Sequence, residues 1–358
     1  MSLAEMIVVG VVLLLLVFGG ISSRLSQFLE LPQPWASAFY FLGLMVSLGI
    51  IMMPLTYYQS YVLPQRYDLS RQTFRDWLMD GLKASAIGLL LGLAIVIVVY
   101  CLIDNFQGTW WLWAAVALFL FTVLLTRLMP IILLPVFYDL EPLNDVNLRQ
   151  KLTVVAERAR TEIRGIFTMD LSSKGTMANA MLAGLGDTRR IILSDTLIDQ
   201  YTPEEIEVIM AHELGHHLHR DITKLIIMQA GIFLAAFYLG DMVLKAGVVP
   251  LGLNGIADVA ALPLLALSLA AFSLLITPLV NAFSRKVESS ADKTALELTD
   301  NPGAFVTAMA KLTDQNLSVA SPSRLVELWY YDHPPYVRRV NLARSYSKRA
   351  IQGAETSG

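Results

Sequence analysis

Apolar residues in this chain are gathered into long runs, and this clustering restricts the possible folds more than any other feature. At least four stretches of about 20 residues lack the polar face that a soluble amphipathic helix needs, so they are predicted to span a bilayer. Only 16% of the 358 residues are charged, against about 25% in an ordinary soluble domain. The sequence therefore predicts an α-helical integral membrane protein rather than a soluble enzyme.

Six membrane helices are expected. They lie near Leu3–Ile21, Trp35–Tyr58, Ala84–Ile103, Trp110–Leu134, Leu225–Val243 and Ala260–Val280. The first run resembles the apolar part of a signal peptide, but its only preceding charge is Glu5 and no small-residue cleavage site is clear. We therefore expect it to be a retained membrane helix.

Charged residues and the lone cysteine exclude several other classes. The net charge is −3 and no Lys/Arg block occurs, so no nucleic-acid partner is expected. Cys101 is the only cysteine, which excludes an internal disulfide framework and a cysteine metal site. Within the spans, Arg127 either lines a hydrated cavity or extends to the interface. Asp241 and Lys245 lie four residues apart and are expected to form a helix-end ion pair.

Two polar segments, 137–224 and 281–358, are together long enough to form one compact domain. They alternate with a four-helix membrane region, 1–136, and a two-helix membrane region, 225–280. The polar segments hold most of the Lys and Arg residues, so the positive-inside rule predicts that they and both termini are cytoplasmic. The membrane would be the inner (plasma) membrane of a prokaryote or the endoplasmic reticulum of a eukaryote.

The first polar segment has local signals for helices and strands. A helix is predicted over Asn147–Thr161, followed by short strands over Ile163–Leu171, Met177–Ala183 and Arg189–Ser194, with the last turn at Gly184, Gly186 and Asp187. Thr202, Pro203 and Glu205 then form a capping-box pattern with proline at the first helical position. A helix is therefore expected to begin there and to run to about Arg220.

This last helix contains the run His212-Glu213-Leu214-Gly215-His216. Residues four apart share a helix face, so both imidazoles can reach one zinc ion, while Glu213 lies beside the metal and can polarise its water. The motif therefore indicates a site for one zinc ion per chain, with Glu213 placed to act on a water molecule bound to the metal.

A catalytic zinc needs a third protein ligand and an open position. His217 and His219 are poorly spaced for this and are better explained as surface or interfacial histidines. Glu288 and Asp292 follow the last span and lie four residues apart on one helix face. We expect Glu288 to bind zinc and Asp292 to accept a hydrogen bond from the far nitrogen of a ligand histidine. The alternative for this pair is a solvated acidic helix face.

These motifs resemble those of the membrane-embedded M48 zinc metallopeptidases, specifically the Ste24-type CAAX prenyl protease branch, to which HtpX-type quality-control peptidases are related. The resemblance extends from about Met129 to Arg339. It rests on Pro130–Phe137, Glu141-Pro142-Leu143, Asp170 with Ser172, Asn179-Ala180, Ser284-Arg285, Asn301–Ala304, and His333-Pro334-Pro335 with Arg339. It implies a small α/β zincin-like (gluzincin) catalytic domain and supports Glu288 as the third ligand.

The resemblance also implies roles for further residues. Glu213 would be the general base and then the general acid of peptide hydrolysis. His333 and Arg339 would line the substrate cleft and stabilise the scissile carbonyl, since an oxyanion needs donors besides the metal. The Met177–Ala183 strand, with Asn179 and Ala180, would be the edge strand that pairs with substrate. The substrates implied are peptides or proteins, prenylated or membrane-inserted.

The chain also departs from the Ste24-type pattern. That branch has seven membrane helices, whereas six are expected here, and His217 and Met181 replace aromatic residues. Arg220-Asp221 resembles the HtpX side. The function expected is zinc-dependent, Ste24-like endoproteolysis at the membrane. One alternative is HtpX-like quality-control proteolysis; another is a non-catalytic membrane protein or transporter with an inactive metal site, which predicts paired charges within the spans.

Overall fold

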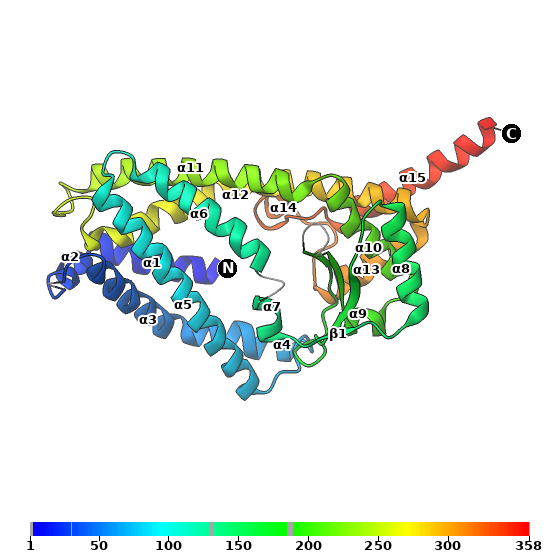
Figure 1. Cartoon of the computed structure of the whole chain (residues 1–358), viewed down its shortest axis with the longest axis horizontal. Helices are drawn as coiled ribbons and strands as arrows, with labels where there is room; N and C mark the ends of the chain where they lie inside the picture. The colour runs from blue at the N-terminus through cyan, green and yellow to red at the C-terminus, as the bar shows by residue number, and fades with distance from the viewer. Residues whose placement is uncertain (1–2, 30, 129–131, 185–188, 358) are drawn as a thin grey trace. The chain divides into compact units, whose positions relative to one another are not determined.

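The computed structural model describes residues 3–29, 31–128, 132–184 and 189–357, and it is mostly helical (Figure 1). The chain divides into two compact units. The first, which we call the helical unit, consists of Met1–Arg66, Thr73–Leu124 and Ile226–Ile276. The second, the α/β unit, consists of Tyr67–Gln72, Leu125–Leu225 and Thr277–Gly358. Helices α11 and α12 contribute residues to both.

The predicted spans all correspond to helices. These are α1 (Leu3–Phe18), α3 (Trp35–Tyr57), α5 (Phe74–Asn105), α6 (Trp110–Leu128), α11 (Asp221–Gly247) and α12 (Leu262–Thr299). Short elements between them are α2 (Ile21–Ser26), a π-helical turn η1 (Tyr58–Val62), α4 (Leu63–Arg66), α7 (Leu134–Phe137) and a 3-10 turn η4 (Val259–Ala261).

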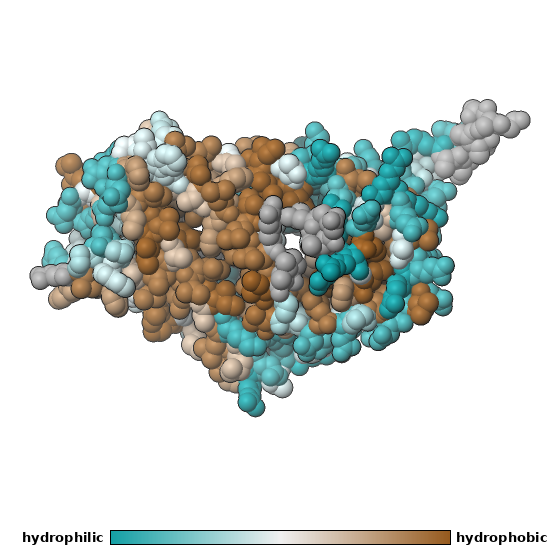
Figure 2. Space-filling model, in the orientation of Figure 1, coloured by the Kyte–Doolittle hydropathy of each residue, from teal (hydrophilic) through white to brown (hydrophobic). Residues whose placement is uncertain are grey.

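Four apolar helical stretches are long enough to cross a membrane in the described part of the chain, namely Trp35–Arg66, Phe74–Asn105, Asp221–Gly247 and Val259–Thr299. Leu3–Phe18 and Trp110–Thr126 are apolar but shorter. The fourth span was predicted to reach Leu134, but α6 ends at Leu128, and 129–131 lie outside the described residues. In Figure 2, apolar atoms cover most of the visible face of the helical unit, as the sequence predicts for helices in lipid.

Asp241 is the partner of two polar side chains inside the helical unit. Trp110 is fully buried, and its indole N–H donates to Asp241 at 2.7 Å. The ammonium of Lys245 lies 2.7 Å from the other carboxylate oxygen of Asp241, which confirms the predicted helix-end pair. The prediction for Arg127 concerns a side chain that lies outside the described part of the structure.

The α/β unit contains a four-stranded sheet in the order β1-β2-β4-β3. Its strands are β1 (Leu140–Pro142), β2 (Gly165–Met169), β3 (Ala180–Ala183) and β4 (Arg190–Ser194). β2 and β4 are parallel, whereas β1 with β2 and β3 with β4 are antiparallel. The sequence did not predict β1, because three residues that include a proline give no alternating pattern. Of the predicted turn after β3, 185–188 lie outside the described residues.

Helices cover this sheet and enclose the core. They are α8 (Val146–Arg158), α9 (Asp195–Gln200), α10 (Pro203–Leu218), α13 (Pro302–Gln315) and α15 (Tyr336–Ser357). Helix α14 (Arg324–Tyr330) contacts α12 instead. Leu152, Ile191 and Phe305 are fully buried in one apolar cluster that also contains the inner face of α10. This cluster fixes α10 against the sheet and so determines where its polar face lies.

Candidate metal centre

Helix α10 begins at the predicted capping box. The Thr202 hydroxyl accepts a hydrogen bond from the amide of Glu205, and the Glu205 carboxylate accepts one from the amide of Thr202. Ile206, Met210 and Leu214 are fully buried at four-residue spacing. Since the apolar stripe packs into the core, the neighbouring face carries the two motif histidines towards α12.

Close approach of α10 to α12 depends on Gly215. A Cβ atom at this position would lie 3.1 Å from the Cα atom of Ala291 and 3.2 Å from its carbonyl oxygen. Because glycine has no such atom, the helices can pack with little separation. Glu288 and Asp292, on either side of Ala291 in α12, thereby reach the histidines of α10.

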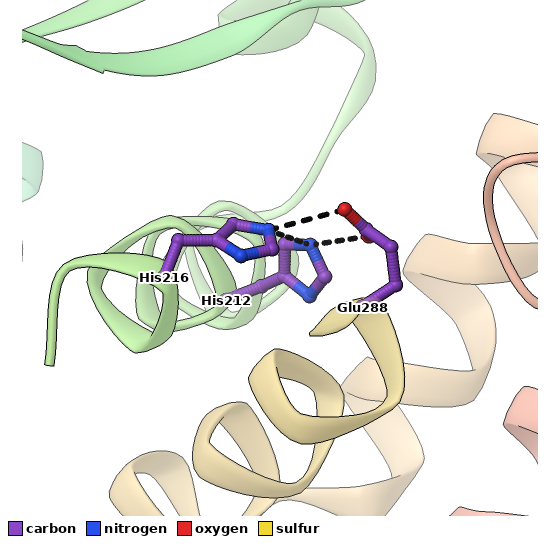
Figure 3. Close-up of side chains that lie close together, drawn as sticks. All are labelled: His212, His216 and Glu288. Atoms are coloured by element: carbon purple, nitrogen blue, oxygen red, sulfur yellow. Dashed lines mark hydrogen bonds and ion pairs between the residues drawn. The ribbon is translucent and has the colours of Figure 1, made fainter. Parts of the chain in front are cut away.

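His212, His216 and Glu288 point towards one another, the first two from α10 and the third from α12 (Figure 3). The two histidine Nε2 atoms are 3.2 Å apart. Glu288 Oε2 lies 3.2 Å from His212 Nε2, and Glu288 Oε1 lies 3.3 Å from His216 Nε2. Glu288 Oε2 is buried and has no hydrogen-bond partner among the described residues. Three converging donors with a buried, unsatisfied oxygen are suited to a cation.

Each histidine is oriented by a buried carboxylate on its other ring nitrogen. His212 Nδ1 lies 2.9 Å from Asp292, whose side chain is 1% exposed. His216 Nδ1 lies 3.0 Å from Asp221, whose side chain is 2% exposed. The contact of His216 with Asp221 is a hydrogen bond, whereas Asp292 lies beside His212 Nδ1 without hydrogen-bond geometry. Carboxylates in these positions favour the tautomer that presents Nε2 to the centre, as in metal sites where an outer carboxylate orients the ligand.

Asp221 was not predicted to belong to the site. Helix α10 ends at Leu218, Arg220 adopts a left-handed backbone (φ 53°), and α11 starts at Asp221. This sharp turn brings Asp221 back to His216. An acidic residue shortly after the second histidine is the only local signal, and it is weak without knowledge of the turn.

Glu213 lies between two cavities of the α/β unit. One, of about 460 Å³, is also lined by His212, His333 and Arg339. The other, of about 600 Å³, is also lined by His216 and Glu288. Burial raises the pKa of the Glu213 carboxyl above its usual value. A carboxylate with a raised pKa beside a cation site is suited to accepting and returning a proton near neutral pH.

His333 and Arg339 both reach the centre but differ in their contacts. The His333 side chain is 55% exposed, and its Nε2 atom lies 3.4 Å from Glu288. Its Nδ1 atom is 2.8 Å from Asp332, which raises the pKa of the imidazole. Arg339 donates two hydrogen bonds to Asp292, at 2.7 and 2.8 Å, and its guanidinium lies 3.9 Å from Glu288. Its nearest partner is thus a carboxylate that orients His212, a contact that the sequence did not predict.

The strand predicted over Met177–Ala183 corresponds to β3 and lies at the edge of the sheet, although it is shorter than predicted. β3 pairs only with β4 in the described part of the sheet. Asn179, just before it, exchanges hydrogen bonds with Ser194, and Ala180 is paired with Leu193. Leu182 lines the same cavity as Glu213 and His216. An unpaired strand edge beside the centre can bind an extended peptide.

Two further histidines, His217 in α10 and His219 at its C-terminal end, lie outside the donor group. His219 contacts the hydroxyls of Ser290 and Thr294, at 2.7 and 3.1 Å. His217 is half-buried, and burial together with Arg189 lowers the pKa of its imidazole. Neither belongs to the cluster formed by His212, His216 and Glu288.

Comparison with families gives two matches that together extend along most of the chain. Residues 142–347 match the family model described as peptidase family M48. Residues 1–139 match the model described as CAAX prenyl protease N-terminal, five membrane helices. In that range, α1, α3, α5 and α6 are the apolar helices that the described residues form.

Individual relatives agree with these matches. An uncharacterized metalloprotease of Bacillus subtilis, YhfN, is 30% identical over 336 residues, covering 92% of this chain and 78% of the relative. The CAAX prenyl protease 1 homolog of Arabidopsis thaliana is 29% identical over 325 residues, covering 87% and 72% of the two chains. The crystal structure of S. mikatae Ste24p matches the fold with a TM-score of 0.82 at 23% identity, covering 92% of this chain and 82% of that one.

Proposed function

This chain belongs to peptidase family M48, and from that premise we propose that it uses zinc to hydrolyse peptide bonds in prenylated CAAX sequences. The matches make it a membrane metalloendopeptidase of the Ste24 type, which acts on peptide or protein substrates at a membrane. The choice of zinc, the role of each residue and the prenylated substrate are the proposed parts. The observation that carries them is the His-His-Glu donor group with Glu213 beside it.

Distances between the donors support zinc held by His212, His216 and Glu288. In a tetrahedral zinc site with bonds of about 2.0–2.1 Å, neighbouring ligand atoms lie about 3.3 Å apart. Here His212 Nε2 lies 3.2 Å from both His216 Nε2 and Glu288 Oε2, and His216 Nε2 lies 3.3 Å from the other carboxylate oxygen, Oε1. With one ligand atom taken from each residue, the three atoms lie within 4.8 Å of one another. Two imidazoles and one carboxylate also form a ligand set of catalytic zinc sites, which leave a fourth position for water or substrate.

The chemistry divides between the cation and the side chains. When bound, the cation supplies Lewis-acid polarisation of a water molecule and of the scissile carbonyl. Glu213 accepts the proton of the attacking water and returns it to the leaving amine, with no covalent acyl-enzyme. His333 and Arg339, which line the cavity beside Glu213, donate to the developing oxyanion. Asp292 keeps His212 in the ligand tautomer.

Substrate binding is assigned to the edge of β3 and to the two cavities. Asn179 and Ala180 lie where an extended peptide can add to the sheet through main-chain hydrogen bonds. The prenylated CAAX substrate is inferred from the relatives that are named CAAX prenyl protease 1 and from the match over 1–139. The proposed catalytic domain joins 137–224 to 281–358 on the cytoplasmic face, with 1–136 and 225–280 in the membrane.

A pair of peptides tests the proposal. Purified full-length protein with zinc is incubated with a farnesylated C-terminal CAAX peptide or its unprenylated twin, and Glu213→Gln serves as the blank. We expect the wild type to cut the farnesylated peptide, and the variant to keep zinc but lose at least about 10²-fold in kcat. Wild-type turnover by Glu213→Gln would refute the mechanism.

The same experiment separates substrate classes. Equal cleavage of both peptides would show that the lipid is not recognised and would favour general proteolysis of membrane proteins. Cleavage of neither peptide by zinc-loaded protein would remove the CAAX assignment, and unfolded membrane proteins would be tested next. In both cases the metalloprotease mechanism is tested separately, by whether Glu213→Gln loses the cleavage activity that the wild type shows.

A further inference from the structure

Four polar side chains lie along one face of α12, and only two of them belong to the metal centre. They are Asn281, Arg285, Glu288 and Asp292, at spacings of four, three and four residues. Side chains at these spacings point to the same side of a helix. The first two do not contact the donors. They contact the segment that leads to His333.

Asn281 and Arg285 hold the end of α14 through its main chain. The Asn281 amide donates to the carbonyls of Leu328 and Trp329, at 3.2 and 3.0 Å. The Arg285 guanidinium donates to the carbonyls of Glu327, at 2.9 Å, and Tyr331. Carbonyls at the C-terminal end of a helix lack partners within it and favour positive charge. Four main-chain carbonyls within five residues, from 327 to 331, therefore bind the end of α14 to α12.

A buried ion pair adds to this attachment. The side chains of Arg285 and Glu327 are only 12% and 10% exposed, and Arg285 Nε lies 3.4 Å from the Glu327 carboxylate. Glu327 also pairs with Arg338, at 2.8 Å, but that arginine is 62% exposed. A planar guanidinium that makes several hydrogen bonds in a buried position allows little movement.

His333 follows Tyr331 by two residues, and its Nε2 atom lies 3.4 Å from Glu288, which is one turn beyond Arg285 on α12. We propose that Asn281 and Arg285 are positioning residues, which hold His333 over the metal centre so that it can donate to the substrate carbonyl. The inference rests on the proposed function of His333. Helix α12 then has two roles. Glu288 provides a metal ligand, while Asn281 and Arg285 set the distance between that ligand and His333.

A double-mutant cycle distinguishes positioning from general structural support. His333→Ala is expected to lower kcat by about 10²-fold, as for the loss of one oxyanion donor. Arg285→Gln is expected to lower kcat by about 10- to 100-fold with KM changed less than about twofold, because misplacement of a donor affects the transition state. The double variant should be no slower than His333→Ala alone. Multiplying losses, or wild-type kcat for Arg285→Gln, would overturn the proposal.

Matched variants make the cycle specific. Arg338→Gln removes the exposed partner of the same Glu327 and should leave kcat within about twofold. Arg285→Lys keeps the charge but cannot make the same set of hydrogen bonds, so its kcat should fall between the wild type and Arg285→Gln. If Arg285→Gln does not fold, Asn281→Ala tests the same coupling with a smaller perturbation, and additive losses there would also refute it.

A second readout does not depend on activity. In hydrogen exchange with mass spectrometry, Arg285→Gln should speed exchange over 327–333 while α10 stays protected and zinc content is unchanged. Unchanged exchange over 327–333 would refute the attachment. If the wild type cuts neither CAAX peptide, the proposed CAAX substrate is wrong. The same kinetic series is then run with unfolded casein as the substrate. An incorrect substrate assignment is thereby distinguished from an incorrect positioning role for Arg285.

Discussion

Gly215→Ala should weaken metal binding although it adds only one methyl group. The new Cβ would lie 3.1 Å from Ala291 Cα, and 3.2 Å from both the carbonyl oxygen of Ala291 and Thr294 Cβ. Two of these three atoms are backbone atoms of α12, so no side chain can move aside to relieve all the contacts. The substitution therefore has to push α12 away from α10, and Glu288 lies on α12 only three residues before Ala291.

The size of the shift can be compared with the tolerance of a metal site. Restoring an ordinary contact of 3.4 Å requires a movement of about 0.3 Å. Metal–ligand distances are held within about 0.2 Å, so one bond would be stretched or the site would have to rearrange. We expect a loss in zinc affinity of about tenfold, or about 1.4 kcal/mol.

Helix propensity acts in the opposite direction and makes the prediction sharper. Alanine favours a helix interior over glycine by about 1 kcal/mol, whereas overpacking costs about 1–3 kcal/mol. The metal-free protein should thus lose little thermal stability while zinc affinity falls. Gly231→Ala in α11, where a Cβ would meet nothing within 4 Å, is the control. Competition with a chelating dye measures affinity, and wild-type affinity for Gly215→Ala would refute the reasoning.

Three further results are expected. Asp221→Ala should weaken zinc binding by about 10- to 100-fold in the same dye assay, because His216 loses the carboxylate that orients it; unchanged affinity would remove Asp221 from the site. In the metal-free protein, burial opposes protonation of His212, but Asp292 and Glu288 outweigh this effect and raise the pKa of its imidazole to about 9. Because zinc must displace this proton, zinc affinity should fall as the pH drops below about 9. Calorimetry in buffers of different ionisation enthalpy should detect the release of the proton. Thr202→Ala should lower the free energy of unfolding by about 1 kcal/mol through loss of the helix cap, measured as a lower Tm without any change in zinc content at saturation.

Elements with local causes were predictable from the sequence. The apolar runs form helices because a helix pairs the backbone N–H and C=O groups of one segment with each other, so that it needs no specific partner in lipid. The start of α10 followed from Thr202 and Glu205, whose reciprocal hydrogen bonds need only four residues of chain. The pairing of Asp241 with Lys245 likewise requires only the spacing of a helix.

Contacts between distant segments were not accessible in this way. Arg339 was placed at the substrate carbonyl by resemblance, yet its closest partner is Asp292, 47 residues earlier. The contact between Arg285 and Tyr331 spans 46 residues and involves a main-chain carbonyl, which no side-chain pattern reveals. Asp221 is near His216 in sequence, but its contact depends on the left-handed turn at Arg220, and arginine carries no signal for that conformation.

The charges around the donors give an independent reason to expect a divalent cation. Four carboxyl groups lie at or beside the site, and in the described part of the chain two cationic side chains pair with them: Lys224 with Asp221, and Arg339 with Asp292 and, at 3.9 Å, with Glu288. With neutral histidines and ionised carboxyl groups, four negative charges face two positive ones, which leaves two negative charges in excess, and Glu213 pairs with no Lys or Arg in the described part of the chain. Buried charges are costly unless they are paired or bind a metal. A divalent ion would balance this excess. The metal-free centre has to take up protons instead, and the pKa of its most buried histidine, His212, is therefore raised to about 9. Metal and protons therefore compete for the same excess of negative charge. Removal of the Glu288 carboxylate should weaken metal binding and also lower the pKa of His212.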